Sequence, residues 1–180
     1  MEIFKGRPSD ADKREEREKR VYDMLDRIGI EYMRADHSKA DTMEDCEEIG
    51  KALGVEICKN LFLCNRQKTK FYLLMMPDKK PFKTKELSAQ INSARLSFAS
   101  EEDMLKYLDI KPGSVSVMGL MNDKENNVRL LIDEDLLNDE YIGCHPCVNT
   151  SSMKIKTCDI TGKFLNEVGH DYTKVKLIGE

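Results

Sequence analysis

The sequence predicts an α+β protein with a mixed, largely antiparallel sheet. Two pairs of apolar runs are each separated by a short polar turn, at 65–69 and at 122–126, which is typical of β-hairpins. Short segments in which apolar residues recur with helical spacing interrupt these runs. Hairpins interrupted by short helices indicate the α+β class. The length of 180 residues suits a single domain, 1–180, with a sizeable core.

Five helices are expected, and three of them begin with the spacing of a capping box. Those three are 9–29 with Ser9 and Asp12, 42–53 with Thr42 and Asp45, and 100–108 with Ser100 and Asp103. The other two cover 84–91 and 159–168. A glycine stands at the end of the first helix, at Gly29, and follows those that end at 53 and 168, where it can adopt the left-handed conformation of a helix end.

The expected strands are runs of apolar and β-branched residues bounded by polar turns. In chain order they are 30–35, 60–64, 70–76, 114–118, 127–132, 153–157 and 175–178.

The first helix carries an unbroken run of charged residues over 12–20. We favour a solvated helix with local ion pairs as the interpretation. The alternative is a contact with a nucleic acid through the cations of this run, which are Lys13, Arg14, Arg17 and Arg20.

Composition excludes several classes of protein. Hydrophobic residues make up 40% and charged residues 34% of the chain, which is typical of a soluble globular protein. No apolar run has membrane-spanning length, and residues 1–6 lack the apolar core of a signal peptide, so we expect a cytoplasmic protein without a membrane partner. A net charge of −4 argues against broad nucleic-acid binding, although a few local cations could still hold the end of a nucleic acid.

Lys59 and Asn60 stand at the start of an apolar run that predicts a buried strand. A lysine fixed at a strand end can stabilise an anionic intermediate or hold a phosphate, and an asparagine amide can bind a ligand. Because side chains alternate along a strand, the two are expected to point to opposite faces. From the local sequence alone, a solvated lysine at a strand end is the simpler interpretation.

A second motif is the turn Pro112-Gly113-Ser114-Val115. Gly113 lets the backbone approach a ligand closely, and successive N–H groups of such a turn can hold an anion. Gly119 could likewise permit close approach of a substrate. The alternative is an ordinary turn that leads into a strand.

The third motif contains His145 and Pro146, followed by Asn149 and Thr150. A histidine titrates near neutral pH, so His145 can position water or exchange a proton. Asn149 and Thr150 are candidates to support it. The alternative is a histidine that is hydrogen-bonded to the backbone of its own turn.

Cys144 and Cys147 bracket His145, but no second pair of ligands accompanies them. A zinc site needs about four ligands. The other cysteines stand singly, and His37 and His170 are isolated along the chain. We therefore expect no metal, and we interpret the cysteines as reduced, small, buried residues.

The three motifs, in this order and at this spacing, resemble the YbaK-type aminoacyl-tRNA deacylases, and most closely their freestanding prolyl-tRNA editing branch. The resemblance runs from about residue 30 to the end, which makes the helix at 9–29 an addition. It implies a curled mixed sheet surrounded by short helices. Val117 and Met118 precede Gly119 where the family often has Pro-Phe, so Met118 is expected on the wall of the amino-acid pocket, and the preferred amino acid is left open.

The resemblance implies a trans-editing hydrolase that removes a wrong amino acid, alanine in the first place, from tRNA for proline. The alternatives are a cysteinyl-tRNA deacylase and a non-catalytic tRNA- or synthetase-binding module of the same fold. The implied catalytic residues are Lys59, Asn60 and His145. The implied substrate-binding residues are Gly113, Ser114, Met118, Gly119, Asn149 and Thr150. The implied partners are the acceptor end of tRNA for proline and, as a candidate, prolyl-tRNA synthetase, and no cofactor is implied.

Overall fold

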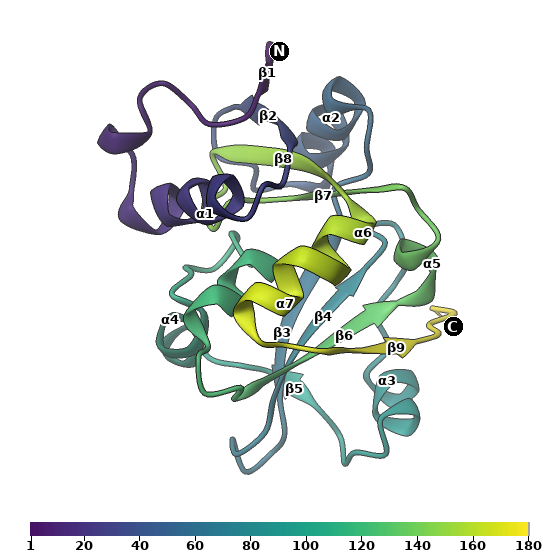
Figure 1. Cartoon of the computed structure of the whole chain (residues 1–180). Coiled ribbons are helices and arrows are strands. Elements are labelled where there is room, and N and C mark those ends of the chain that lie inside the picture. Colours follow the sequence, from purple (N-terminus) through teal and green to yellow (C-terminus); the bar gives the residue numbers. More distant parts are fainter. Residues whose placement is uncertain (180) are drawn as a thin grey trace.

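The computed structural model describes residues 1–179 and contains two β-sheets in that range (Figure 1). The sheet in the upper part of Figure 1 has four antiparallel strands in the order β1-β2-β8-β7. The lower sheet has five strands in the order β5-β3-β4-β6-β9, and in it β6 runs parallel to both β4 and β9. The prediction of an α+β fold with mixed, largely antiparallel strands is confirmed.

The strands are β1 (Ile3–Lys5), β2 (Tyr32–Asp36), β3 (Lys59–Cys64), β4 (Phe71–Met76), β5 (Ser97–Phe98), β6 (Val128–Asp133), β7 (Tyr141–Cys144), β8 (Ser151–Lys156) and β9 (Tyr172–Val175). The α-helices are α1 (Glu16–Arg27), α2 (Met43–Leu53), α3 (Thr84–Gln90), α4 (Glu101–Leu108), α5 (Glu134–Leu137), α6 (Thr157–Asp159) and α7 (Leu165–Val168). A π-helical segment (Ile160–Phe164) joins α6 to α7, and 3₁₀ turns cover Ala11–Lys13 and Val117–Asn122.

Two of the predicted helix starts are confirmed by their hydrogen bonds. The hydroxyl of Thr42 accepts from the backbone of Asp45, whose carboxylate accepts from Thr42 in return, and this capping box begins α2. Gly54 ends α2 in the left-handed conformation. The hydroxyl of Ser100 likewise accepts from the backbone of Asp103 at the start of α4.

The predicted start of the first helix at residue 9 is wrong. A 3₁₀ turn comes first, and α1 begins only after Glu15, which makes no side-chain cap. Its expected end is confirmed, because Gly29 follows with φ +74°. The sequence prediction also missed β1, β5, α5 and β7.

Two predicted strands are wrong. The run 114–118 lies in no strand, because the side chain of Ser116 accepts a hydrogen bond from the backbone of Met118 and begins a 3₁₀ turn. Such a local bond competes with the ladder of a sheet. At the end of the chain the strand is β9 rather than 175–178, and it pairs with β6 through residues 172–175.

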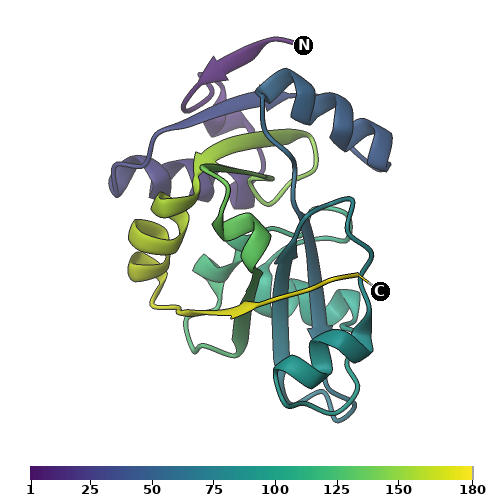
Figure 2. The ribbon, with the colours of Figure 1, turned by 90° about the vertical axis from the view of Figure 1, so that its right-hand side faces the viewer.

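Three apolar clusters fill the spaces between the layers. The largest lies between the sheets and under α1, and includes Tyr22, Phe62 and Met153. A second covers the other face of the five-stranded sheet and includes Leu87 of α3. The third holds α2 on the outer face of the four-stranded sheet, where Figure 2 shows it at the top of the molecule. No helix in the described part of the chain combines the length and apolarity needed to cross a membrane.

The two sheets are joined at Gly143, near the end of β7. Its N–H donates to the carbonyl of Glu56, and its carbonyl accepts from the N–H of Cys58, at 3.3 and 3.0 Å. Ile57 thereby forms a parallel bridge with Gly143. A Cβ atom at position 143 would lie 2.9 Å from the Glu56 carbonyl oxygen and 2.8 Å from Ile57, so only glycine fits without a shift.

The charged run 12–20 is used inside the protein. Arg14 forms ion pairs with Glu18 and with Asp36 of β2 at 2.8 and 2.9 Å. Arg17 and Arg20 both pair with Asp109, which follows α4. The favoured interpretation of ion pairs is supported, although the pairs reach other elements and are not only local.

We expect Gly143→Ala to destabilise the protein by about 1–3 kcal/mol, since a methyl group forced into a filled space strains its neighbours. Urea denaturation followed by circular dichroism measures the change. Gly162→Ala is the matched control: no atom lies within 4 Å of the position that its methyl group would take, and alanine favours a helix more than glycine does. Equal stability of the two variants would contradict the role of this junction.

Candidate functional site

The junction of the sheets brings two of the predicted motifs together. Ile57 and Gly143 are bridged in parallel, and two residues further along each segment stand Lys59 and His145. The start of β3 and the turn after β7 therefore leave the junction in the same direction. The site begins at this point.

Lys59 is half-buried, and its Nζ donates to the carbonyl oxygen of Lys80 at 2.8 Å. No carboxylate in residues 1–179 lies within ion-pair distance of it. Burial raises the pKa of nearby Asp78, and the positive charges of Lys59 and Lys79 offset part of that rise. Lys59 is thus a positioned cation whose charge has no paired carboxylate.

Asn60 points to the other face of β3, as the alternation of the strand predicts. Its Nδ2 donates to the carbonyl and the Sγ of Cys58, at 3.3 and 3.4 Å. Its Oδ1 is buried and has no hydrogen-bond partner among the described residues. A buried acceptor without a partner costs free energy, so Asn60 is suited to receive a donor from a ligand.

His145 is buried in the turn after β7. Its Nδ1 lies 2.9 Å from the carbonyl oxygen of Ser151 and 3.1 Å from Oγ of Ser152. A carbonyl can only accept, so Nδ1 carries the hydrogen and Nε2 is left as an acceptor in the neutral ring. Burial lowers the pKa of His145, the hydrogen bond to Ser151 opposes this, and nearby His37 lowers it further.

His37 was wrongly judged to be isolated. Its ring lies 6.3 Å from that of His145, and its Nε2 is 2.9 Å from Oγ of Ser152. Ser152 therefore links the half-exposed His37 to the buried His145. Sequence spacing could not reveal this, because β2 and β8 become neighbours only in the folded sheet.

The Pro-Gly turn contacts the segment after His145. Gly113 has φ +85°, and a Cβ atom there would lie 3.5 Å from Nδ2 of Asn149. Asn149 donates to Asp41 at 3.3 Å, and the carbonyl of Thr150 accepts from the N–H of His37 at 3.0 Å. The structure thus gathers the second and third motifs around the chain that leads into α2.

The buried Ser114 is less available than predicted. Its backbone N–H donates to the carbonyl of Lys111 at 3.2 Å within the turn itself. This N–H is therefore already hydrogen-bonded within the protein. An anion at this turn would have to bind to the N–H of Gly113.

Met118 and Gly119 lie inside the core rather than beside an open space. Met118 is fully buried in the cluster between the sheets. A Cβ atom at Gly119 would lie 2.7 Å from Ile110 and 3.1 Å from Leu108, so close packing with α4 and the residues after it explains this glycine. Contact of either residue with substrate stays a prediction.

The buried cysteines of the site are held as thiols. Burial raises the pKa of Cys58 and of Cys147 to about 12, and it also raises the pKa of Cys144. A protonated thiol is a poor nucleophile and a poor metal ligand. Within residues 1–179, no group of three or more metal-binding side chains lies together.

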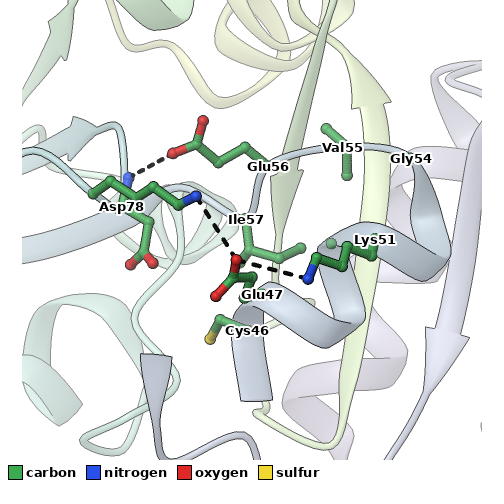
Figure 3. A pocket seen from close by; sticks show the side chains of 10 residues that line it. Cys46, Glu47, Lys51, Gly54, Val55, Glu56, Ile57 and Asp78 are labelled. Atoms are coloured by element: carbon green, nitrogen blue, oxygen red, sulfur yellow. Dashed lines mark hydrogen bonds and ion pairs between the residues drawn. The ribbon is translucent and has the colours of Figure 1, made fainter. Parts of the chain in front are cut away.

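A hollow of about 380 Å³ lies at the junction, and Lys59 is not among the residues that line it (Figure 3). It is formed by α2, the segment 54–57, and Asp78 with Lys79. Figure 3 shows Glu47 of α2 paired with Lys51, and Glu56 bonded to the backbone of Asp78. No sequence pattern indicated these residues, because their polar side chains follow no motif and come together only through folding.

Comparison with known proteins identifies the family. The model of the aminoacyl-tRNA editing domain matches residues 37–162, which include all three motifs. This chain belongs to the aminoacyl-tRNA editing domain family. The prolyl-tRNA editing protein ProX of Acetoanaerobium sticklandii is 30% identical over 153 residues, which cover 85% of this chain and 93% of that protein. Helix α1 precedes the matched range of the editing domain.

One further relative and one solved structure are similar to this chain. The prolyl-tRNA synthetase associated domain-containing protein 1 of Danio rerio is 29% identical, over 84% of this chain and 83% of that protein. A crystal structure described as a candidate trans-editing enzyme for prolyl-tRNA synthetase superposes with a TM-score of 0.67 over 91% of this chain and 99% of that chain. At 16% identity this second likeness shows the fold alone.

We expect the His145 ring to titrate below the usual value of about 6.5, since burial disfavours its charged form. A lowered pKa in the folded state means that stability falls as pH drops below the unfolded value and levels off below the folded one. NMR of the histidine ring protons measures the midpoint, with His145→Gln to assign the signal. A midpoint above 6.5 would contradict the geometry of the site.

Proposed function

We propose that this protein hydrolyses the ester between a wrongly attached amino acid and the terminal ribose of tRNA for proline. Water adds to the ester carbonyl, the bond to the ribose oxygen breaks, and that oxygen takes up a proton. Family membership and the similarity to ProX support this reaction class. Alanine is the amino acid that we place first, and cysteine is the alternative.

The observation that carries the proposal is the position of Lys59. Its ammonium group is held by one backbone carbonyl, without a carboxylate partner in the described chain, two residues after the sheet junction at Ile57. Addition of water to an ester creates a negatively charged tetrahedral intermediate, and stabilising this charge usually contributes more to catalysis than any other single effect. Lys59 can face this oxyanion or the adjoining phosphate.

The other residues position groups and do not attack the ester. Neutral His145 offers an acceptor at Nε2, which can receive a proton from water or from a ribose hydroxyl. Asn60 offers an unpaired buried oxygen to a donor of the substrate. The resemblance suggests that a ribose hydroxyl of the terminal adenosine helps to activate the water, so positioning and electrostatics would supply most of the rate.

The remaining parts of the proposal concern the setting of the reaction. Acting on tRNA would place the protein in the cytoplasm. Relatives named for association with prolyl-tRNA synthetase make that enzyme a candidate partner. The alternative of a non-catalytic binding module keeps the fold, and the unpaired charge of Lys59 speaks against it.

We expect Lys59→Ala to lower single-turnover deacylation of alanyl-tRNA for proline by about 10²–10³-fold, because one electrostatic partner of the intermediate is lost. Lys59→Arg should also be impaired, since the guanidinium is planar and spreads its charge. Lys70→Ala, an exposed lysine beside the β3–β4 turn, is the matched control and should keep the wild-type rate.

Circular dichroism checks that each of these variants is folded. A folded Lys59→Ala protein with a rate close to that of the wild type would overturn the assignment and favour the binding module. The same assay with cysteinyl- and seryl-tRNA decides which amino acid is removed. Faster hydrolysis of the cysteinyl ester would replace alanine as the first choice.

A further inference from the structure

A second hollow, of about 610 Å³, lies on the outer face of the four-stranded sheet. Four lysines line it, and we call it the lysine hollow: Lys5 of β1, Lys154 and Lys156 of β8, and Lys163 of the helix that follows β8. Helix α2 covers the neighbouring part of this face and leaves the lysine hollow open.

The register of the strands places three of these lysines on the same face of the sheet. Lys5 pairs with Met33, and Met33 pairs with Lys154 across β2. Lys156 stands two residues after Lys154, so both point to the same face. The strands therefore hold three cations on one face of the sheet, with Met33 between Lys5 and Lys154, and the helix adds the fourth.

The charge of the lysine hollow is not neutralised. No carboxylate in residues 1–179 lies within 4.0 Å of any of the four ammonium groups. Glu31 and Asp159 also line the hollow, which leaves an excess of two positive charges (four lysines minus two carboxylates). Lys154 instead lies over the ring of Tyr141, 4.4 Å from its centre.

This arrangement differs from that of the arginines in the charged run 12–20, which ends within α1. Arg14, Arg17 and Arg20 are all engaged with carboxylates of the protein. The nucleic-acid contact that the sequence suggested for this run therefore has few free charges to use. In a protein of net charge −4, an open group of unpaired lysines indicates an anionic partner.

The lysine hollow adjoins the candidate site. The Nζ of Lys154 lies 3.6 Å from the position that a Cβ atom on Gly54 would occupy. Gly54 in turn lines the hollow at the sheet junction, together with Ile57. A polymer that crosses the lysine hollow can therefore continue toward the junction of the sheets.

We propose that the lysine hollow binds the phosphodiester backbone of the tRNA whose acceptor end enters the site at Lys59. This inference rests on the proposed function. Lysines bind phosphates as point charges and do not depend on base sequence, which suits the helical stem of a tRNA. Contacts of this kind position the substrate and leave the choice of amino acid to the site.

The test compares two triple variants with the same change of charge. The first, Lys5→Gln/Lys156→Gln/Lys163→Gln, removes the three exposed cations of the lysine hollow. The second, Lys68→Gln/Lys70→Gln/Lys124→Gln, removes exposed lysines from turns elsewhere. Fluorescence anisotropy measures binding of uncharged tRNA for proline at several salt concentrations, and thermal denaturation checks the fold of both variants.

We expect the first variant to bind tRNA at least about tenfold more weakly, with a salt slope lower by about two to three, since each lost phosphate contact removes about one unit. The second variant should bind like the wild type. Hydrolysis of alanyl-adenosine, which has no phosphodiester backbone, should be unchanged in the first variant.

Three outcomes would overturn the proposal. They are wild-type affinity of the first variant, an equal loss in both variants, and tighter binding of the lysine hollow to an acidic peptide than to tRNA. Failure of the proposed function would look different. The wild type would then hydrolyse neither alanyl-tRNA nor alanyl-adenosine, while the binding comparison would still decide the role of the lysine hollow.

Discussion

The backbone bonds between Gly143 and the segment 56–58 are the constraint on which the rest of the structure depends. They tie the four-stranded sheet to the start of β3 and set the direction of two segments at once. Lys59 and His145 follow this junction directly, so its geometry determines where both side chains lie. A Cβ atom at position 143 would clash with a carbonyl oxygen, so the two sheets can approach this closely only because residue 143 is glycine.

The ionisable groups near the junction differ in how their surroundings affect the stability of their charged forms. Burial lowers the pKa of His145 and raises the pKa of Cys58, which favours the neutral form of both, while Lys59 is half-buried and has one carbonyl partner. A neutral imidazole can accept a proton, and an ammonium group can stabilise an anion, but neither can do both. In the proposed hydrolysis, proton transfer and stabilisation of the oxyanion would therefore fall to different residues. Asn60 adds a neutral acceptor on the other face of β3.

Much of the fold was predictable because it depends on local chemistry. The capping box at Thr42 and the alternation of Lys59 and Asn60 involve residues a few positions apart, and the structure confirms both. The strand predicted at 114–118 failed because the hydroxyl of Ser116 offers the backbone a local partner. The link between His37 and His145 through Ser152 was out of reach, because it depends on which strands become neighbours. The motifs thus indicated the chemistry, but not the network that supports it.

The cations of this protein fall into two groups, those paired with carboxylates inside the fold and those without such a partner. Each arginine of the charged run 12–20 has a carboxylate partner, and Asp36 is one of them. Burial alone would raise the pKa of Asp36, but hydrogen bonds from Arg14, Arg34 and Ser151 hold it well below its usual range. Removing one partner of such an ion pair would leave a partly buried charge unpaired. These arginines are therefore needed for the stability of the fold. A lysine without a carboxylate partner stabilises no ion pair of the fold, so its charge is free to bind an anion from outside the protein. The same physical distinction therefore separates Lys59 and the lysine hollow from the charged run that is most conspicuous in the sequence.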